Sequence, residues 1–192
     1  MLTVGMGGLT ESEGRVEMFL MVMLATPIIL GCDIRFMDPT TAALVTHKSL
    51  IEALQDPACS QGNLVRDMDS GETWVRSLSD GSFVAVLINK DDQQSKNVSL
   101  HIGTQHNGGD FFPAAFPKGM MLVDIYTDQV IGFNDDTYTV PLKPHDGQIL
   151  RLAPVGSKAA EELINRFGSN NSNNKGRGIS QSRDSDQIVA TE

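Results

Sequence analysis

The residues with the clearest potential for chemistry are two pairs of adjacent aspartates, Asp91-Asp92 and Asp135-Asp136. Acid–base cleavage of a glycosidic bond needs two opposed carboxyl groups, about 5 to 9 Å apart. Both pairs, however, stand between expected strands, where aspartate side chains commonly bond to nearby backbone N–H groups and form turns. We therefore interpret both pairs as solvated turn residues and not as an acid and a base.

A glycine-rich run, Gly5-Met6-Gly7-Gly8, precedes an expected helix, as in loops that hold dinucleotide phosphates at a helix N-terminus. Thr10 occupies the third glycine position of that motif, and Glu11 and Glu13 would repel a phosphate there. We interpret the run as a flexible strand-to-helix turn. The chain also lacks a Gly-x-Ser-x-Gly nucleophile elbow. These residues therefore give no catalytic group and imply no cofactor.

The cysteines and histidines do not form a metal-binding pattern. Cys32 and Cys59 are the only cysteines, and neither belongs to a Cys-x-x-Cys pair or lies near a histidine at ligand spacing. The four histidines, at positions 47, 101, 106 and 145, are in separate segments. This excludes a zinc module and predicts no metal site. Two cysteines make no disulfide framework, so the redox state of both stays open.

The charge balance limits the partners that we expect. The 192 residues include 15 Lys+Arg against 24 Asp+Glu, which gives a formal net charge of −9. Such a chain repels phosphate backbones, so we expect no nucleic-acid partner. The 18 glycines and 8 prolines are spread through the sequence. This spread favours a domain of short strands and tight turns over a helical bundle.

The longest apolar run extends over residues 18–30 and is interrupted by Pro27. A membrane-spanning helix needs about 20 consecutive apolar residues, so we predict no span and no membrane partner. Residues 29–32 resemble a bacterial lipoprotein cleavage box. The preceding segment, however, carries three glutamates and one arginine where a basic region is required. We therefore expect no signal peptide in this chain.

The first third of the chain predicts an α/β unit. A helix over residues 10–26 begins at a Thr10–Glu13 capping box and ends at Pro27. Residues 28–32 predict a buried strand, and residues 40–54 predict a helix broken near Thr46-His47. One such unit cannot close a barrel. We therefore expect the apolar side chains of residues 18–29 to form a large exposed patch that promotes aggregation of the isolated chain.

From Gln61 to Pro154 the pattern changes to alternation with glycine, asparagine and aspartate turns, which predicts an antiparallel sandwich. A hairpin pairs residues 73–78 with residues 82–89, and its core face carries Val84, Val86 and Ile88 with Trp74 or Leu78 opposite. Further strands are predicted at residues 97–102, 121–126, 137–142 and 148–152.

Five motifs occur in a fixed order along the chain. They are MLTVGMGGLT at 1–10, ATPIILGCDIR at 25–35, Gln55-Asp56-Pro57 with Gln61-Gly62, the hairpin at 74–89, and HDGQILRL at 145–152. In that order they resemble the C-terminal half of the α-galactosidases (melibiases) of glycoside hydrolase family 27. Leu54 departs from the pattern, because the family has asparagine there. The likeness covers roughly residues 1 to 154.

The resemblance implies a fold of two parts. Residues 1–57 would be the last units of a (β/α)₈ barrel, and residues 58–155 an antiparallel Greek-key β-sandwich. The residue pattern adds a short helix at 156–167 and a polar tail at 168–192 that we expect to be disordered. The chain is therefore expected to be a fragment of a multi-domain glycosidase.

The resemblance also implies a chemistry, the retaining hydrolysis of terminal α-D-galactosides by two aspartates. In the family both aspartates precede the segment that matches Met1, so no residue of this chain is expected to be catalytic. Of the pocket-lining positions only Met1 can be carried over as a substrate contact. The chain alone is expected to be inactive. A galactoside or other carbohydrate is the expected substrate of the full-length enzyme, and a homodimer is left open.

Two readings of the chain remain open. It is either a fragment of a secreted, lysosomal or vacuolar α-galactosidase, or a non-catalytic sandwich that serves as an interaction module or is a truncated paralogue. Two N-glycosylation sequons, at Asn97 and Asn170, agree with a secretory route.

Overall fold

The computed structural model describes residues 1–68, 71–102, 116 and 118–168. The expected tail from residue 169 onward, with the Asn170 sequon, lies outside the described residues. The helices are α1 (Glu11–Met23), a 3₁₀ turn (Ile34–Phe36), α2 (Pro39–Val45), α3 (Lys48–Leu54) and α4 (Lys158–Phe167). The strands are β1 (Asn63–Met68), β2 (Gly71–Ser77), β3 (Phe83–Ile88), β4 (Lys96–His101), β5 (Met120–Asp124), β6 (Gln129–Asn134), β7 (Thr137–Leu142) and β8 (Gly147–Pro154).

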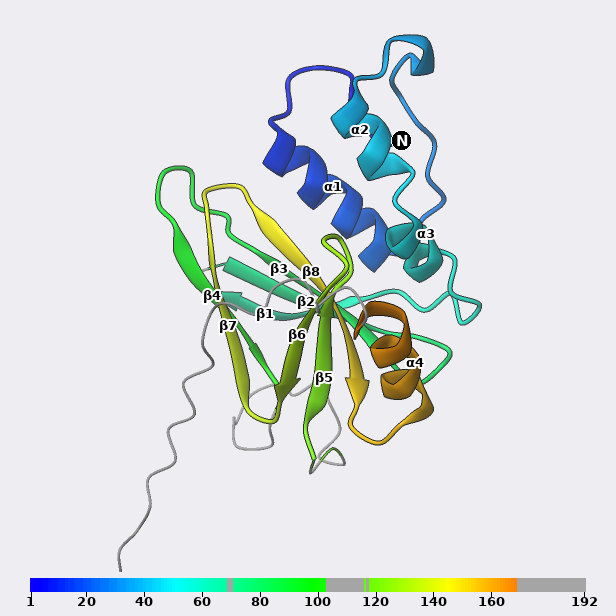
Figure 1. The fold of residues 1–192 in the computed structure, drawn as a ribbon. Helices are drawn as coiled ribbons and strands as arrows, with labels where there is room; N and C mark the ends of the chain where they lie inside the picture. Colours follow the sequence, from blue (N-terminus) through cyan, green and yellow to red (C-terminus); the bar gives the residue numbers. More distant parts are fainter. Residues whose placement is uncertain (69–70, 103–115, 117, 169–192) are drawn as a thin grey trace, which may run out of the picture.

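The strands form two antiparallel sheets. The larger sheet has the order β1-β2-β3-β8-β5-β6, and the smaller one pairs β4 with β7 (Figure 1). A core of side chains from both sheets lies between them and includes Val98 and Leu100 of β4. The predicted antiparallel sandwich is therefore confirmed. The hairpin is also confirmed, because β2 and β3 pair from Glu72–Ile88 to Ser77–Phe83.

The face of the hairpin that lines the sandwich differs from the predicted one. Val84, Val86 and Ile88 are buried together with Leu78, but they face the helices and not the second sheet. The side chains between the two sheets come from the alternate positions, Phe83, Ala85 and Leu87. Every residue of β3 is buried, because helices cover one face of the larger sheet and the β4–β7 pair covers the other. Alternation separates two faces of a strand but does not say which layer covers each one.

Helix α1 begins as the sequence predicts. The Thr10 hydroxyl accepts from the backbone N–H of Glu13, and the Glu13 carboxylate accepts from the N–H of Thr10 at 2.7 Å. The helix ends at Met23, three residues earlier than predicted. Its last turn packs against β1, because Gly62 donates to the carbonyl of Met23 at 2.8 Å and a side chain at Gly62 would overlap the Met23 sulfur. The predicted break between α2 and α3 is confirmed.

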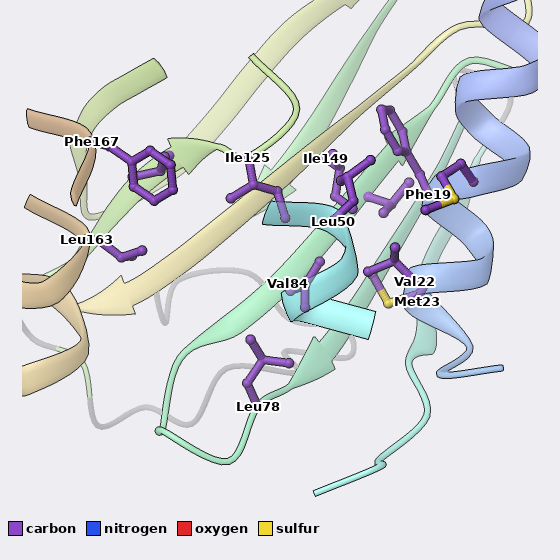
Figure 2. Close-up of a cluster of buried hydrophobic side chains, with 14 of the residues drawn as sticks. Phe19, Val22, Met23, Leu50, Leu78, Val84, Ile125, Ile149, Leu163 and Phe167 are labelled. Carbon is purple, nitrogen blue, oxygen red and sulfur yellow. The ribbon is translucent and has the colours of Figure 1, made fainter. Parts of the chain in front are cut away.

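The apolar face of α1 is covered within this chain. Met18 and Val22 are fully buried with Leu50 of α3 against the larger sheet (Figure 2). The expectation of a large exposed patch is therefore wrong for α1, whereas Ile29 is exposed, as expected. The larger sheet of the sandwich has an apolar outer face, and α1 packs onto it. The sequence of the first third alone does not indicate this packing partner.

The predicted buried strand at residues 28–32 is reduced to one contact. Leu30 forms a single parallel bridge with Leu2, and Ile29 is 66% exposed. A parallel strand needs partners along its length to become a buried ladder, and here Leu2 supplies the only bridge among the described residues. Within those residues, each helix is too short to span a membrane.

Candidate functional site

A cleft of about 420 Å³ lies where the helical segment meets the sandwich. The glycine-rich loop, the first turn of α1 and helix α2 supply most of its walls, and Tyr126 from the β5–β6 turn completes it. Its polar lining includes Glu11, Arg15, Asp38 and Thr41. Three aspartates belong to the predicted barrel end, Asp33, Asp38 and Asp56, and only Asp38 lines this cleft. Met1, the predicted substrate contact, does not line it either.

The glycine-rich loop is a turn and offers no phosphate cradle. Gly5, Gly7 and Gly8 all have positive φ angles, between 81° and 93°, which allow the chain to reverse into α1. The first turn of α1 is occupied by the capping-box carboxylate of Glu13. A phosphate at this helix start would meet a carboxylate, which agrees with the interpretation of a strand-to-helix turn.

Asp33 and Asp38 have structural partners. The Asp33 carboxylate accepts from the Arg35 guanidinium at 2.5 and 2.9 Å, and this hydrogen bonding lowers the pKa of Asp33. Asp38 is the N-cap of α2, where it accepts from the N–H of Thr41 at 2.9 Å. Bonds from Thr41 lower the pKa of Asp38. Both groups are therefore held in the ionised form as acceptors.

Asp56 joins the helical segment to the sandwich. It is buried and accepts from the hydroxyl and the N–H of Ser79, at 2.6 and 3.0 Å, and from the N–H of Ala58 at 3.0 Å. Burial opposes ionisation of this carboxyl, but the hydrogen bonds from Ser79 and Ala58 outweigh it and keep the pKa of Asp56 below its ordinary value. Asp56 therefore acts as a fixed anchor.

The two aspartate pairs are turn residues, as predicted. Asp91 accepts from the N–H groups of Gln93 and Gln94, which together with Lys96 lower its pKa to about 2. Asp135 and Asp136 are exposed in the β6–β7 turn.

Six described carboxyl groups have a pKa that is shifted in the direction opposite to that of an acid catalyst. A glycosidase general acid must hold its proton near neutral pH, so its pKa is raised. Among the described carboxyl groups, every one whose pKa departs from its ordinary value has that pKa lowered. The described part of the chain also contains no cluster of three or more metal-ligating side chains.

The remaining predicted site residues lie apart from the cleft. Met1 is 70% exposed and lies beside Gly31, together with Met6. Asn97 is exposed on β4. Cys32 is partly buried and Cys59 exposed, and neither forms a disulfide.

The residue that connects the helical segment to the sandwich most directly was not predicted from the sequence. Arg76 of β2 is completely buried on the helix-facing side of the larger sheet. Its Nη1 donates to the carbonyl of Val22 at the end of α1, at 2.6 Å, and to the carbonyl of Ala53 in α3, at 3.0 Å. Burial lowers the pKa of this guanidinium, and Asp56 opposes the shift. The sequence held one signal for this role: Arg76 is a charged residue two positions after Trp74, so both side chains lie on the same face of the predicted strand.

The fold defines the class of the protein. Two antiparallel sheets packed face to face make a β-sandwich domain, here with helices on the outer face of the larger sheet. Residues 69–152 match the family model described as the alpha galactosidase C-terminal beta sandwich domain. Residues 69–152 are therefore similar to the C-terminal sandwich of alpha-galactosidases, and the predicted resemblance is confirmed.

Individual relatives agree with this match. The alpha-galactosidase of Cyamopsis tetragonoloba is 31% identical over 118 residues, which are 58% of this chain and 29% of that protein. The alpha-galactosidase of Coffea arabica is 39% identical over 88 residues, or 46% of this chain and 23% of that protein. The matched segment thus spans less than a third of either relative.

The structural comparison extends beyond the sandwich. Alpha-galactosidase I from Mortierella vinacea superposes with a TM-score of 0.70 and 20% identity over 82% of this chain and 39% of that chain. The superposed part is longer than residues 63–192, which begin at the first strand of the sandwich. The shared fold therefore includes part of the helical segment, residues 1–62. At this level of identity the likeness concerns the fold.

Proposed function

We propose that this chain is the C-terminal part of a retaining α-galactosidase that releases terminal α-D-galactose, and that both catalytic aspartates come from outside these 192 residues. The observation that carries the proposal is the match of residues 69–152 to the alpha-galactosidase sandwich. The lowered pKa values of Asp33, Asp38 and Asp56 support it, because none of these three groups suits the role of a proton-holding acid.

Within this proposal, residues 1–57 are the end of a (β/α)₈ barrel. The parallel bridge between Leu2 and Leu30 supports this assignment. Helix α1 follows Leu2, and helices α2 and α3 follow Leu30, which is the strand-then-helix order of such a barrel. Exposed apolar side chains in the same segment also support it, because further barrel strands and helices would cover them. They are Met1, Met6, Ile29, Ile34 and Phe36.

Met1 is the proposed substrate contact. It stands next to the bridged Leu2, and it corresponds to a pocket-lining position in the family that the sequence resembles. A galactoside is the proposed substrate of the whole enzyme, and a homodimer its proposed assembly.

The upstream coding region tests the proposal. We expect an in-frame continuation that ends in Trp-Asn-Asp-Pro-Asp directly before Met1, and we expect the extended protein to hydrolyse 4-nitrophenyl α-D-galactoside. In that protein, Met1→Ala should lower kcat/KM by about tenfold through loss of one apolar substrate contact. Leu64→Ala, an exposed position on β1, is the matched control and should leave kcat/KM unchanged. An in-frame stop codon just upstream, or an inactive extended protein that folds, would instead favour the non-catalytic module or truncated paralogue.

Asn97 tests the proposed secretory route. Its side chain is exposed, and Ser99, the third residue of the sequon, lies on the same strand with its hydroxyl 2.9 Å from that of Thr139. When the protein is expressed through a secretory pathway, we expect peptide N-glycosidase treatment to increase its electrophoretic mobility. Asn97→Gln should remove one glycosylated band, with Asn63→Gln, outside any sequon, as the control. Identical mobility before and after treatment would contradict the assignment.

A further inference from the structure

The turn between β7 and β8 forms a rigid platform next to α1. Asn89, at the end of β3, donates from its side-chain nitrogen to the carbonyls of Leu142 and Lys143, at 3.1 and 3.0 Å, and to that of Gln94 at 2.9 Å. Its backbone N–H donates to the carbonyl of Asp146 at 2.9 Å. The turn and the loop after β3 are therefore fixed relative to each other.

His145 projects from this platform toward two carboxylates. Its Nε2 lies 3.0 Å from Oδ1 of Asp92, in the loop after β3, and its Nδ1 lies 3.3 Å from Oε1 of Glu13, in the first turn of α1. The backbone of His145 has a φ of 54°, a conformation that few residues other than glycine adopt but that histidine tolerates better than most. The turn thus presents the imidazole between the helical segment and the sandwich.

Because one carboxylate lies at each ring nitrogen, the contact of His145 with Glu13 and Asp92 depends on whether the imidazole is protonated. A neutral imidazole carries one N–H and one lone pair, so it can donate to only one of the two carboxylates and turns its lone pair toward the other. The imidazolium donates from both nitrogens and attracts both carboxylates. Both bonds can therefore form together only when His145 is charged.

Other charged groups face the same region. Glu13 and Glu17 of α1, with Lys90 and His145, border a cleft of about 510 Å³ whose floor is apolar. Lys90 lies 3.2 Å from Glu72, and Glu17 accepts from the N–H and hydroxyl of Thr3. Arg15 pairs with Asp146 at 2.8 Å and joins the same helix to the same turn at any pH at which the aspartate is ionised. Lys143 belongs to the turn itself.

We propose that His145 is a pH-sensitive clamp that fastens the N-terminal turn of α1 to the sandwich in acid and loosens it near neutral pH. Arg15–Asp146 remains as the constant attachment, so the change is confined to the first turns of α1. The clamp requires charged His145 together with ionised Glu13 and Asp92. It is therefore strongest between about pH 4.5 and pH 6, in the range where carboxyl groups have ionised and imidazole is still protonated.

The sign follows from proton linkage. The folded state offers a protonated imidazole two carboxylate partners, Glu13 and Asp92, that the unfolded chain lacks. The stabilisation is present below the pH range in which imidazole ionises and is lost as pH rises through that range.

Hydrogen exchange of the 192-residue chain at pH 5.5 and pH 7.5 tests the clamp, with rates corrected for intrinsic chemistry. We expect the amides of residues 13–17 to be about three- to tenfold better protected at pH 5.5. His145→Gln should abolish this difference and leave the protection at pH 7.5 unchanged. Glu13→Gln keeps the capping box, since glutamine also serves at that position, and should likewise remove most of the pH effect.

His101→Gln is the matched control, because His101 lies on β4 and its Nδ1 is 2.9 Å from the Thr137 hydroxyl on β7. It should retain the full pH dependence at residues 13–17. Equal protection at both pH values in the wild-type chain would overturn the proposal. An unchanged pH effect in His145→Gln would overturn it as well.

Discussion

Arg76→Ala should lower the free energy of unfolding by about 3 to 5 kcal/mol, which makes it the most destabilising single change that we predict. The guanidinium bonds to the carbonyls of Val22 and Ala53, which belong to α1 and α3. Alanine would remove this donor from both carbonyls; among the described residues, Val22 would keep only the backbone N–H of Ala25, at 3.3 Å. A buried acceptor left unsatisfied costs about 1 to 3 kcal/mol, and the lost side chain would add a cavity. Buried Nε and Nη2 of Arg76 have no partner among the described residues, and this cost reduces the net loss.

Thermal and urea unfolding measure this effect. A loss of that size should lower the Tm by about 10 °C in a domain of this length. Arg76→Lys keeps the charge and one reachable carbonyl, so its effect should be intermediate. Arg35→Ala is the control, because Arg35 is exposed and pairs only locally with Asp33; it should change stability by less than about 0.5 kcal/mol. Equal stability of Arg76→Ala and wild type would contradict the assigned role.

The parts of the fold that depend on neighbouring residues could be predicted from the sequence. The capping box of α1, the break between α2 and α3, and the β2–β3 hairpin all follow from local patterns. Strands β1 and β6 were not predicted, because adjacent apolar residues, Leu64-Val65 and Val130-Ile131, break the alternation that indicates a strand. In the structure the side chains of β6 alternate between exposed and half-buried.

The parts that depend on distant contacts could not be predicted. The acceptors of Arg76 lie 54 and 23 residues away in sequence, so its role becomes visible only when α1, α3 and β2 are in place. The same holds for His145, whose partners Glu13 and Asp92 come from two other elements. The helix-facing position of Val84 has this cause too, since α1 covers a sheet face that the local pattern assigns to the sandwich interior.

The isolated 192-residue chain should have no α-galactosidase activity. Retaining hydrolysis needs a carboxylate nucleophile and a positioned acid, and without both only binding contributions to the barrier remain. Asp33, Asp38 and Asp56 are the carboxylates nearest the proposed barrel end. Each of them is ionised and engaged with an arginine or with backbone N–H groups. None is free to act as nucleophile or acid.

The most direct measurement is the rate at which the purified, folded chain releases 4-nitrophenol from 4-nitrophenyl α-D-galactoside, with a full-length α-galactosidase as the positive control. Circular dichroism and a cooperative melt establish that the sample is folded. We expect a rate equal to the buffer blank at every pH from 4 to 8. A saturable rate that follows the chain through purification, and that is lost in Asp33→Asn, Asp38→Asn or Asp56→Asn, would contradict the account and place the catalytic carboxylates within this chain.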